Sequence, residues 1–222
     1  MRINADFTQR VLVRPADYRW VDSPMQGVER MMLDRIGDEV ARATSLVRYA
    51  PNTTFPPHVH GGGEEFFVLD GVFGDEHRSY PAGTYARNPV GTSHAPRVGD
   101  QGCVIFVKLH QFDPADDTPV VVETRAANWP RPISPGIEEL RLHRFRGERV
   151  SLMRWAPDTR WPSHGHDGGE EIFVVAGEFS DEHGDYPAGT WLRLPQGGRH
   201  EACAGGGGAL LYLKKGHLPA SG

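Results

Sequence analysis

The chain repeats itself at an offset of 106 residues. Residues 58–94 align with residues 164–200 without a gap, and 22 of these 37 positions are identical. Further upstream, an offset of 109 residues aligns Val11–Val13 with Val120–Val122. A unit of roughly a hundred residues is too long for a solenoid repeat and has the size of a small domain. We therefore predict two tandem domains, residues 1–112 and residues 113–222.

Short apolar runs lie between turn residues throughout the chain. The sequence contains 27 glycines and 18 prolines. Apolar runs recur in corresponding places of the two repeats, as Phe66–Leu69 with Ile172–Val175 and as Val104–Val107 with Leu210–Leu213. We find no segment with the apolar spacing of a helix. Many short strands separated by Gly and Pro turns predict an all-β fold, either a sandwich or a double-sheet jelly roll.

Each repeat carries three histidines and one glutamate at metal-binding spacing. His58, His60 and Glu64 follow the pattern H-x-H-x3-E, and His94 comes later in the same repeat. The second repeat has the same set in register: His164, His166, Glu170 and His200. Residues two apart on a strand share a face, so Glu64 has the parity of the histidines and Glu65 has the opposite one. Glycines at 61–63 allow a bend that would reset this parity.

A surface histidine pair is usually only a solvated face, but the duplication of the whole set in register favours two metal sites per chain. Imidazole nitrogens and a carboxylate oxygen suit borderline divalent ions. Four protein ligands nearly saturate tetrahedral zinc, whereas five- or six-coordinate ions keep open positions. We predict zinc as the favoured cofactor, with iron, nickel or manganese as alternatives.

These residues resemble the two cupin motifs. The first motif matches at His58, His60, Glu64 and Gly71, and the second, G-x5-P-x-G-x2-H, at Gly83, Pro89, Gly91 and His94. The second repeat matches both motifs at the corresponding positions: His164, His166, Glu170, Gly177, Gly189, Pro195, Gly197 and His200. The asparagine that often follows the second motif is absent from both repeats. The resemblance implies two tandem cupin barrels of the jelly-roll type, each with a metal inside its mouth.

A narrower resemblance covers most of the chain. Residues 45–76 and 80–96 look like the C-terminal cupin domain of ChrR-type anti-sigma factors. That resemblance implies a sensor of singlet oxygen or related oxidants. ChrR-type regulators also carry an N-terminal helical zinc domain that grips the sigma factor. No such HxxxCxxC cluster precedes the first predicted strand, so sigma-factor binding is not expected.

Composition limits the environment and the partners. Lys plus Arg is 24 and Asp plus Glu is 29, which gives a net charge of -5. This mild acidity gives no reason to expect nucleic acid or an anionic membrane as a partner. Cys103 and Cys203 form no CxxC pair, and the N-terminus has no long apolar run, so we expect a cytoplasmic protein. A homodimer and a small-molecule ligand in the barrels are compatible with the sequence.

A few further residues have two interpretations. Arg87 and Arg193 are equivalent, and each either makes an ordinary salt bridge, which we favour, or binds an anionic ligand in its barrel. Cys103 and Cys203 are interpreted as small buried hydrophobic residues rather than redox groups. No catalytic residue is assigned, because no candidate base beyond the metal ligands is visible.

Three functions follow from these predictions. The first, by the ChrR resemblance, is an oxidant or small-molecule sensor with a regulatory role. The second is a metal-dependent dioxygenase acting on a diketone- or flavonol-like substrate. The third is a binding or storage protein without turnover. The sequence also leaves open whether Val11–Val13 covers a sheet edge of its own barrel or of the sister barrel.

Overall fold

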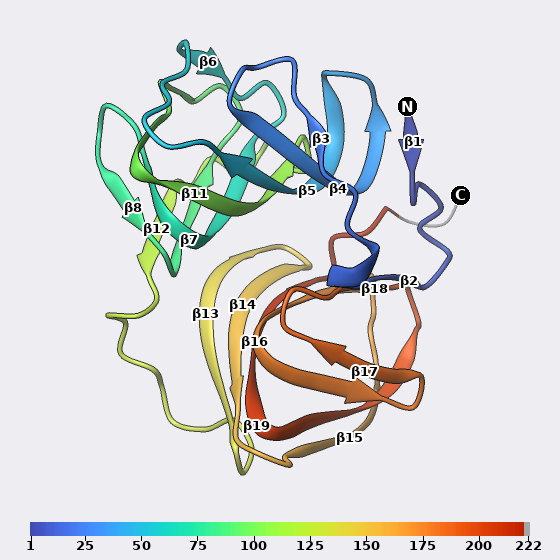
Figure 1. Ribbon diagram of the computed structural model, residues 1–222. Helices are drawn as coiled ribbons and strands as arrows, with labels where there is room; N and C mark the ends of the chain where they lie inside the picture. Colours follow the sequence, from blue (N-terminus) through green and yellow to red (C-terminus); the bar gives the residue numbers. More distant parts are fainter. Residues whose placement is uncertain (220–222) are drawn as a thin grey trace. The chain divides into compact units, whose positions relative to one another are not determined.

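Strands form nearly all the regular structure of the protein (Figure 1). The computed structural model describes residues 1–219, and within them the only helical element is a short 3-10 turn, η1 (Pro15–Asp17). The described residues include no helix with the length and apolarity that crossing a membrane requires. The prediction of an all-β fold is confirmed. The strands belong to two compact units, one for each repeat.

The first unit comprises Met1–Ala5 and Arg19–Ala127. Its large sheet has the order β1-β4-β5-β11-β7-β9-β12, with β3 beside β4 and β8 beside β7, and β6 and β10 form a separate pair. The strands are β1 (Arg2–Ile3), β3 (Val21–Asp22), β4 (Val28–Gly37), β5 (Ala41–Tyr49), β6 (His58–Val59), β7 (Glu64–Gly74), β8 (Ser79–Pro81), β9 (Thr84–Asn88), β10 (Ser93–His94), β11 (Arg97–Leu109) and β12 (Val120–Glu123). All ladders in this unit are antiparallel.

The second unit comprises Asp6–Tyr18 and the chain from Asn128 onward. Its sheet has the order β13-β14-β19-β16-β18-β2, with β15 beside β19 and β17 beside β16. The strands are β2 (Val11–Val13), β13 (Ile137–Phe145), β14 (Glu148–Trp155), β15 (Arg160–Gly165), β16 (Glu170–Asp181), β17 (Gly184–Pro187), β18 (Trp191–Leu194) and β19 (Arg199–Lys215). The order from β13 to β2 in the second unit therefore repeats the order from β4 to β12 in the first.

Each unit contains one strand from the other repeat. β2 comes from the N-terminal segment and pairs with β18 of the second unit, with Leu12 opposite Leu192. β12 starts the second repeat and pairs with β9 of the first unit, with Val121 opposite Ala86. The two registers are equivalent under the repeat offsets, so the exchange is reciprocal. The predicted boundary at residues 112 and 113 stays a prediction about the repeats, because the units in space do not divide the chain at one point.

The core of each unit is built from the same positions of the repeat. In the first unit Phe66, Val68, Phe73, Ile105 and Val107 belong to one buried cluster. Their counterparts in the second unit, in the same order, are Ile172, Val174, Phe179, Leu211 and Leu213. Each of these side chains contributes about 1.5–3 kcal/mol when it is fully buried. This apolar layer fixes the β7–β11 and β16–β19 ladders, from whose ends the candidate sites are built.

Candidate metal centres

Strand pairing brings the first and third histidines of each set together. In the first unit His58 on β6 lies directly opposite His94 on β10. The ring centroids of these two side chains are 4.9 Å apart, and the His60 ring lies 5.2 Å from His58 and 4.6 Å from His94. Three imidazole rings from two strands and a turn therefore surround one point.

A tight turn, rather than continuous strand parity, adds the glutamate. β6 ends at Val59 and β7 begins at Glu64, so the segment between them leaves the sheet. The His60 amide donates to the Thr92 carbonyl at 2.8 Å, and Gly63 has a φ of +77°, a left-handed conformation that glycine adopts without strain. Glu64 then follows with its Oε2 at 3.4 Å from His60 Nε2.

The second unit assembles the same set. His164 on β15 lies opposite His200 at the start of β19, and their ring centroids are 4.9 Å apart. His166 lies 4.7 Å from His164 and 4.9 Å from His200 by the same measure. In each unit one potential ligand atom from each of the four residues lies within 4.8 Å of the others. Each unit thus brings together the four residues that the sequence singled out in its repeat.

An aspartate lies behind the third histidine of each set. Asp75 Oδ2 is 3.5 Å from His94 Nδ1 and accepts a hydrogen bond from the Tyr80 hydroxyl at 2.7 Å. Asp181 Oδ2 is likewise 3.5 Å from His200 Nδ1. A carboxylate in this position orients a ligating histidine and raises its basicity. The sequence reasoning missed both aspartates, although their identity in the two repeats was a signal for them.

Burial keeps the inner histidines neutral. It lowers the pKa of His60 and of His166 to about 4. Burial also lowers the pKa of His94 and of His164. Burial raises the pKa of Glu170, but the Lys215 ammonium and the neighbouring histidines outweigh it and hold that pKa below its usual value. Neutral imidazoles and an ionised carboxylate are the protonation states that bind metals.

The two sets fit a divalent metal ion. The Nε2 atoms of His60, His94 and His166 are buried and have no hydrogen-bond partner among residues 1–219. Buried polar atoms are normally satisfied, so unpartnered nitrogens that converge with a carboxylate have the donor set of a metal site. The outer histidines have their Nδ1 atoms near backbone carbonyls, at 3.3 Å for His58 with Pro56 and 3.0 Å for His164 with Pro162. This arrangement leaves Nε2 as the atom available to a metal.

The adjacent glutamates point away from these sets. Glu65 Oε2 accepts hydrogen bonds from Arg87 Nη1 and from the Tyr85 hydroxyl, both at 2.9 Å. Arg87 also pairs with Asp116. In the second unit Glu171 Oε1 lies 3.0 Å from His217 Nε2.

The Arg87 guanidinium therefore makes salt bridges, as favoured from the sequence. The Arg193 guanidinium donates to the Asp6 carbonyl at 2.9 Å and lies over the Phe7 ring.

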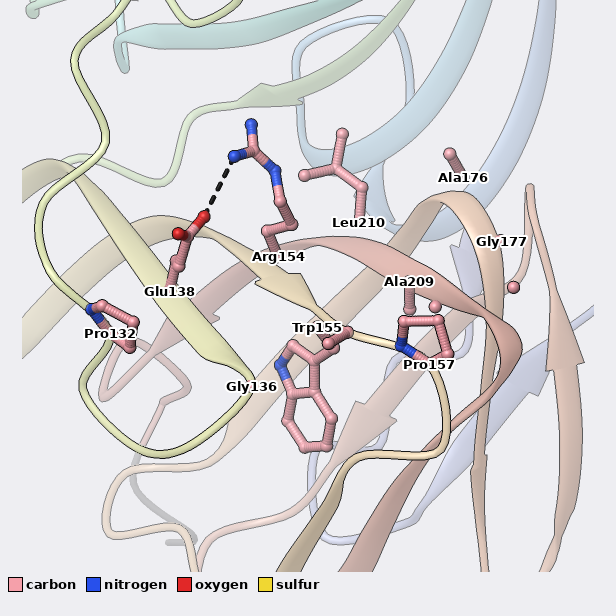
Figure 2. A pocket seen from close by; sticks show the side chains of 13 residues that line it. Pro132, Gly136, Glu138, Arg154, Trp155, Pro157, Ala176, Gly177, Ala209 and Leu210 are labelled. Atoms are coloured by element: carbon pink, nitrogen blue, oxygen red, sulfur yellow. Dashed lines mark hydrogen bonds and ion pairs between the residues drawn. The ribbon is translucent and has the colours of Figure 1, made fainter.

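One hollow of the second unit and the two cysteines lie apart from these ligand sets. A hollow in the second unit has a volume of 540 Å³. Its charged side chains, Glu138 and Arg154, pair with each other at 2.9 Å, and Figure 2 shows them with the other lining residues. None of the eight predicted ligands lines it.

Cys103 is buried and Cys203 is partly buried, and both are free thiols. Burial raises the pKa of Cys103 to about 12, which suits a packing role.

Two jelly-roll units, each with three histidines and a glutamate around one point, define a tandem cupin. A family model for the ChrR cupin-like domain matches residues 8–113 and again residues 117–219. The chain therefore belongs to the ChrR cupin-like family, as the resemblance of its motifs predicted. No curated protein sequence matches the chain.

Solved structures share the fold at low sequence identity. One from Nostoc punctiforme, described as a putative dioxygenase, is 13% identical with a TM-score of 0.77, and the match covers 95% of this chain and 84% of that one. Oxalate decarboxylase from Lactobacillus farciminis is 13% identical with a TM-score of 0.65, covering 94% and 86%. Salicylate 1,2-dioxygenase from Pseudoaminobacter salicylatoxidans is 13% identical with a TM-score of 0.61, covering 78% and 69%. At this identity the likeness concerns the fold.

Proposed function

We propose that this protein is a metal-binding sensor of an oxidant or small molecule and that the first barrel receives the signal. The observation that carries the proposal is a cavity of 450 Å³ in the first unit that reaches the candidate metal ligands. His58, His60 and Glu64 form part of its lining. The rest is largely apolar and includes Met25, Val28, Val47, Phe55, Val107 and Leu109.

The metal would be held by His58, His60, Glu64 and His94, and in the second unit by His164, His166, Glu170 and His200. Zinc is the favoured ion, and iron, nickel and manganese are the alternatives. A divalent ion in such a site supplies a Lewis acid or, for iron and manganese, a redox centre. The protein's own part is to orient the ligands through Asp75 and Asp181 and to offer an apolar path to the first site.

Membership of the ChrR cupin-like family supports the sensor reading, because the resemblance of the motifs implies oxidant sensing. A molecule that enters the first cavity reaches the exposed His58 and the buried His60, because both line it. Loss of one ligand there would release the metal or rearrange the β6–β10 pair. We infer that the protein acts as a sensor in the cytoplasm, where free cysteines are ordinary.

A metal-dependent dioxygenase is the second candidate. The cavity of the first unit is large enough for a small organic substrate and ends at the ligand set, as a substrate site requires. The likeness in fold to salicylate 1,2-dioxygenase is compatible with this function. A diketone- or flavonol-like compound would chelate the metal through adjacent oxygens.

One experiment separates the two functions. The metal-loaded chain is exposed to singlet oxygen or peroxide, and released metal is followed with a chromophoric chelator. In parallel, oxygen consumption is recorded with diketones and flavonols. A sensor gives release of metal that is stoichiometric with the protein, and no sustained oxygen uptake. Many turnovers of oxygen uptake per metal would instead establish the dioxygenase and contradict the sensor.

A further inference from the structure

The first difference between the two sites lies at an equivalent position on the last long strand of each barrel. Leu109 at the end of β11 lies opposite Glu64 in the ladder, and Lys215 at the end of β19 lies opposite Glu170 in the same register. Lys215 Nζ lies 2.9 Å from Glu170 Oε1. The second site therefore already contains a cation against its candidate carboxylate ligand, and the first contains an alkyl group at that place.

The glutamate of the first site is held by a neutral donor instead. Asn88 Nδ2 donates to Glu64 Oε2 at 3.0 Å, and the position equivalent to Asn88 is Leu194. An amide orients the carboxylate and leaves its negative charge for a metal. An ammonium neutralises much of that charge and repels a second cation. The carboxylate of the second site is thus the poorer metal ligand.

The inner histidine is also fixed differently. His60 Nδ1 lies 3.0 Å from the Thr92 hydroxyl, which leaves Nε2 facing the site. The position equivalent to Thr92 is Gly198, which has no side chain to offer, and His166 Nδ1 lies 3.2 Å from Glu170 Oε2. The first site is therefore organised by neutral hydrogen bonds that its counterpart lacks. Such outer contacts strengthen metal binding.

The space beside the second site is smaller and partly filled by the lysine. The cavity that reaches His164, Glu170 and His200 has a volume of 180 Å³, against 450 Å³ in the first unit. Lys215 is part of its lining, as are Trp161 and Met153, where the first repeat has Phe55 and Val47. Larger side chains and a lysine leave less room for an external ligand.

One equivalent position in the cavity walls also carries charges of opposite sign. Arg30 lines the first cavity, and the equivalent residue in the second is Glu139. The Arg30 guanidinium donates to the exposed Glu39 at 3.3 Å and 3.5 Å, and Glu139 accepts a hydrogen bond from Arg141 at 3.1 Å. A positive group beside an open metal position favours a small organic anion as the ligand of the first barrel.

We propose that Lys215 closes the second site to external ligands and weakens its metal binding, so that the first barrel alone exchanges a small anionic ligand at its metal. This inference rests on the proposed function, because it assumes that both ligand sets hold a metal. Leu109 and Lys215 are then the residues that decide which barrel is open. The second metal has a structural role, and the first is the one that meets the signal.

The test uses the full chain with one site removed at a time. The variant His164→Ala/His200→Ala keeps the first site, and His58→Ala/His94→Ala keeps the second. Each is loaded with Co²⁺, quantified by elemental analysis and titrated with azide while the visible spectrum is recorded. The first-site protein is expected to change its spectrum with azide. The second-site protein is expected to bind Co²⁺ about tenfold more weakly and to show no change.

Matched variants exchange the residues at positions 109 and 215 in the two single-site proteins. Lys215→Leu in the second-site protein should raise Co²⁺ affinity about tenfold and produce an azide response, whereas Lys215→Arg should leave the site closed. Leu109→Lys in the first-site protein should do the reverse. An azide response of the second-site protein equal to that of the first overturns the inference, as does a Leu109→Lys protein that keeps both affinity and response. Failure of both single-site proteins to bind Co²⁺ overturns the proposed function itself.

Discussion

Neighbouring glutamates have opposite surroundings at the start of β7. Glu64 lies among the histidines, and Glu65 is buried beside Arg87 and Tyr85. The same sequence pair, EE, therefore supplies one candidate metal ligand and one structural ion pair. The difference between them can be measured.

Substitution of the two glutamates should give opposite results. Glu64→Gln should lower the metal content of the first site, because it removes the anionic ligand. Glu65→Gln should retain the metal but lower the free energy of unfolding by about 3–5 kcal/mol, because it leaves Arg87 with less buried negative charge. Elemental analysis and denaturant unfolding measure the two effects. Metal loss from Glu65→Gln without loss from Glu64→Gln would contradict this assignment.

Cys103 offers a prediction about pH. Burial, with a smaller contribution from Asp70, raises the pKa of its thiol to about 12. The thiolate is the reactive form, so the native thiol should be inert at pH 8 and should become reactive when unfolding restores a pKa near 9.0. The variant Cys203→Ser isolates this thiol, and a disulfide reagent measures its rate. Fast reaction of the folded variant at pH 8 would show that Cys103 is accessible and not a packing residue.

The sequence could predict the eight candidate ligands because the duplication places them in register at motif spacing. It could not predict that Lys215 lies beside a candidate ligand. The equivalent residue, Leu109, differs in chemistry, and the pairing of these positions with Glu64 and Glu170 depends on the ladder register. Asp75 and Asp181 could have been found, since both repeats contain DEH after a strand. Their contact with a histidine nearly twenty residues away depends on the turn that returns the chain.

At the scale of elements, the strand pattern predicted an all-β fold but not the partner of each edge strand. Val11–Val13 is predicted to be a strand from its composition, but its three consecutive apolar residues do not select one sheet edge. The structure pairs it with β18 in the second unit. The first metal motif is similar, because the glycines at 61–63 left a bend open in the prediction, and the structure ends β6 at Val59 and begins β7 at Glu64.

The position of β2 can be tested by hydrogen exchange. Leu12 packs against the core cluster of the second unit. Leu12→Asp should therefore loosen β2 and increase amide exchange in Trp191–Leu194, with a cost of about 1–3 kcal/mol. Exchange in Thr84–Asn88, the equivalent strand of the first unit, should stay unchanged. An increase confined to Thr84–Asn88 would mean that β2 belongs to the first barrel.

At the scale of the whole molecule, the reciprocal exchange means that neither repeat contains all the strands of its own unit. Residues 1–112 include β2, which belongs to the second unit, and lack β12, which belongs to the first. Without β12 the outer edge of β9 exposes unpaired backbone groups. A division of the chain by repeat therefore differs from a division by folding unit.

Two fragments compare these divisions. Residues 1–112 should be insoluble or should melt without cooperativity, because β9 is left as an open edge. Residues 19–127 should be more soluble and should melt cooperatively, since they contain β3 to β12. Circular dichroism and gel filtration provide the measurements. A monomeric, cooperatively melting, metal-loaded 1–112 fragment would show that the exchanged strand is dispensable.

The most direct measurement is the metal content of the full chain after saturation and removal of excess metal. Two equivalents per chain are expected, one for each set of three histidines and a glutamate. His60→Ala should retain one equivalent, because the sets lie in separate units. Less than one equivalent in the unmodified chain, or loss of both metals from His60→Ala, would contradict two independent metal centres.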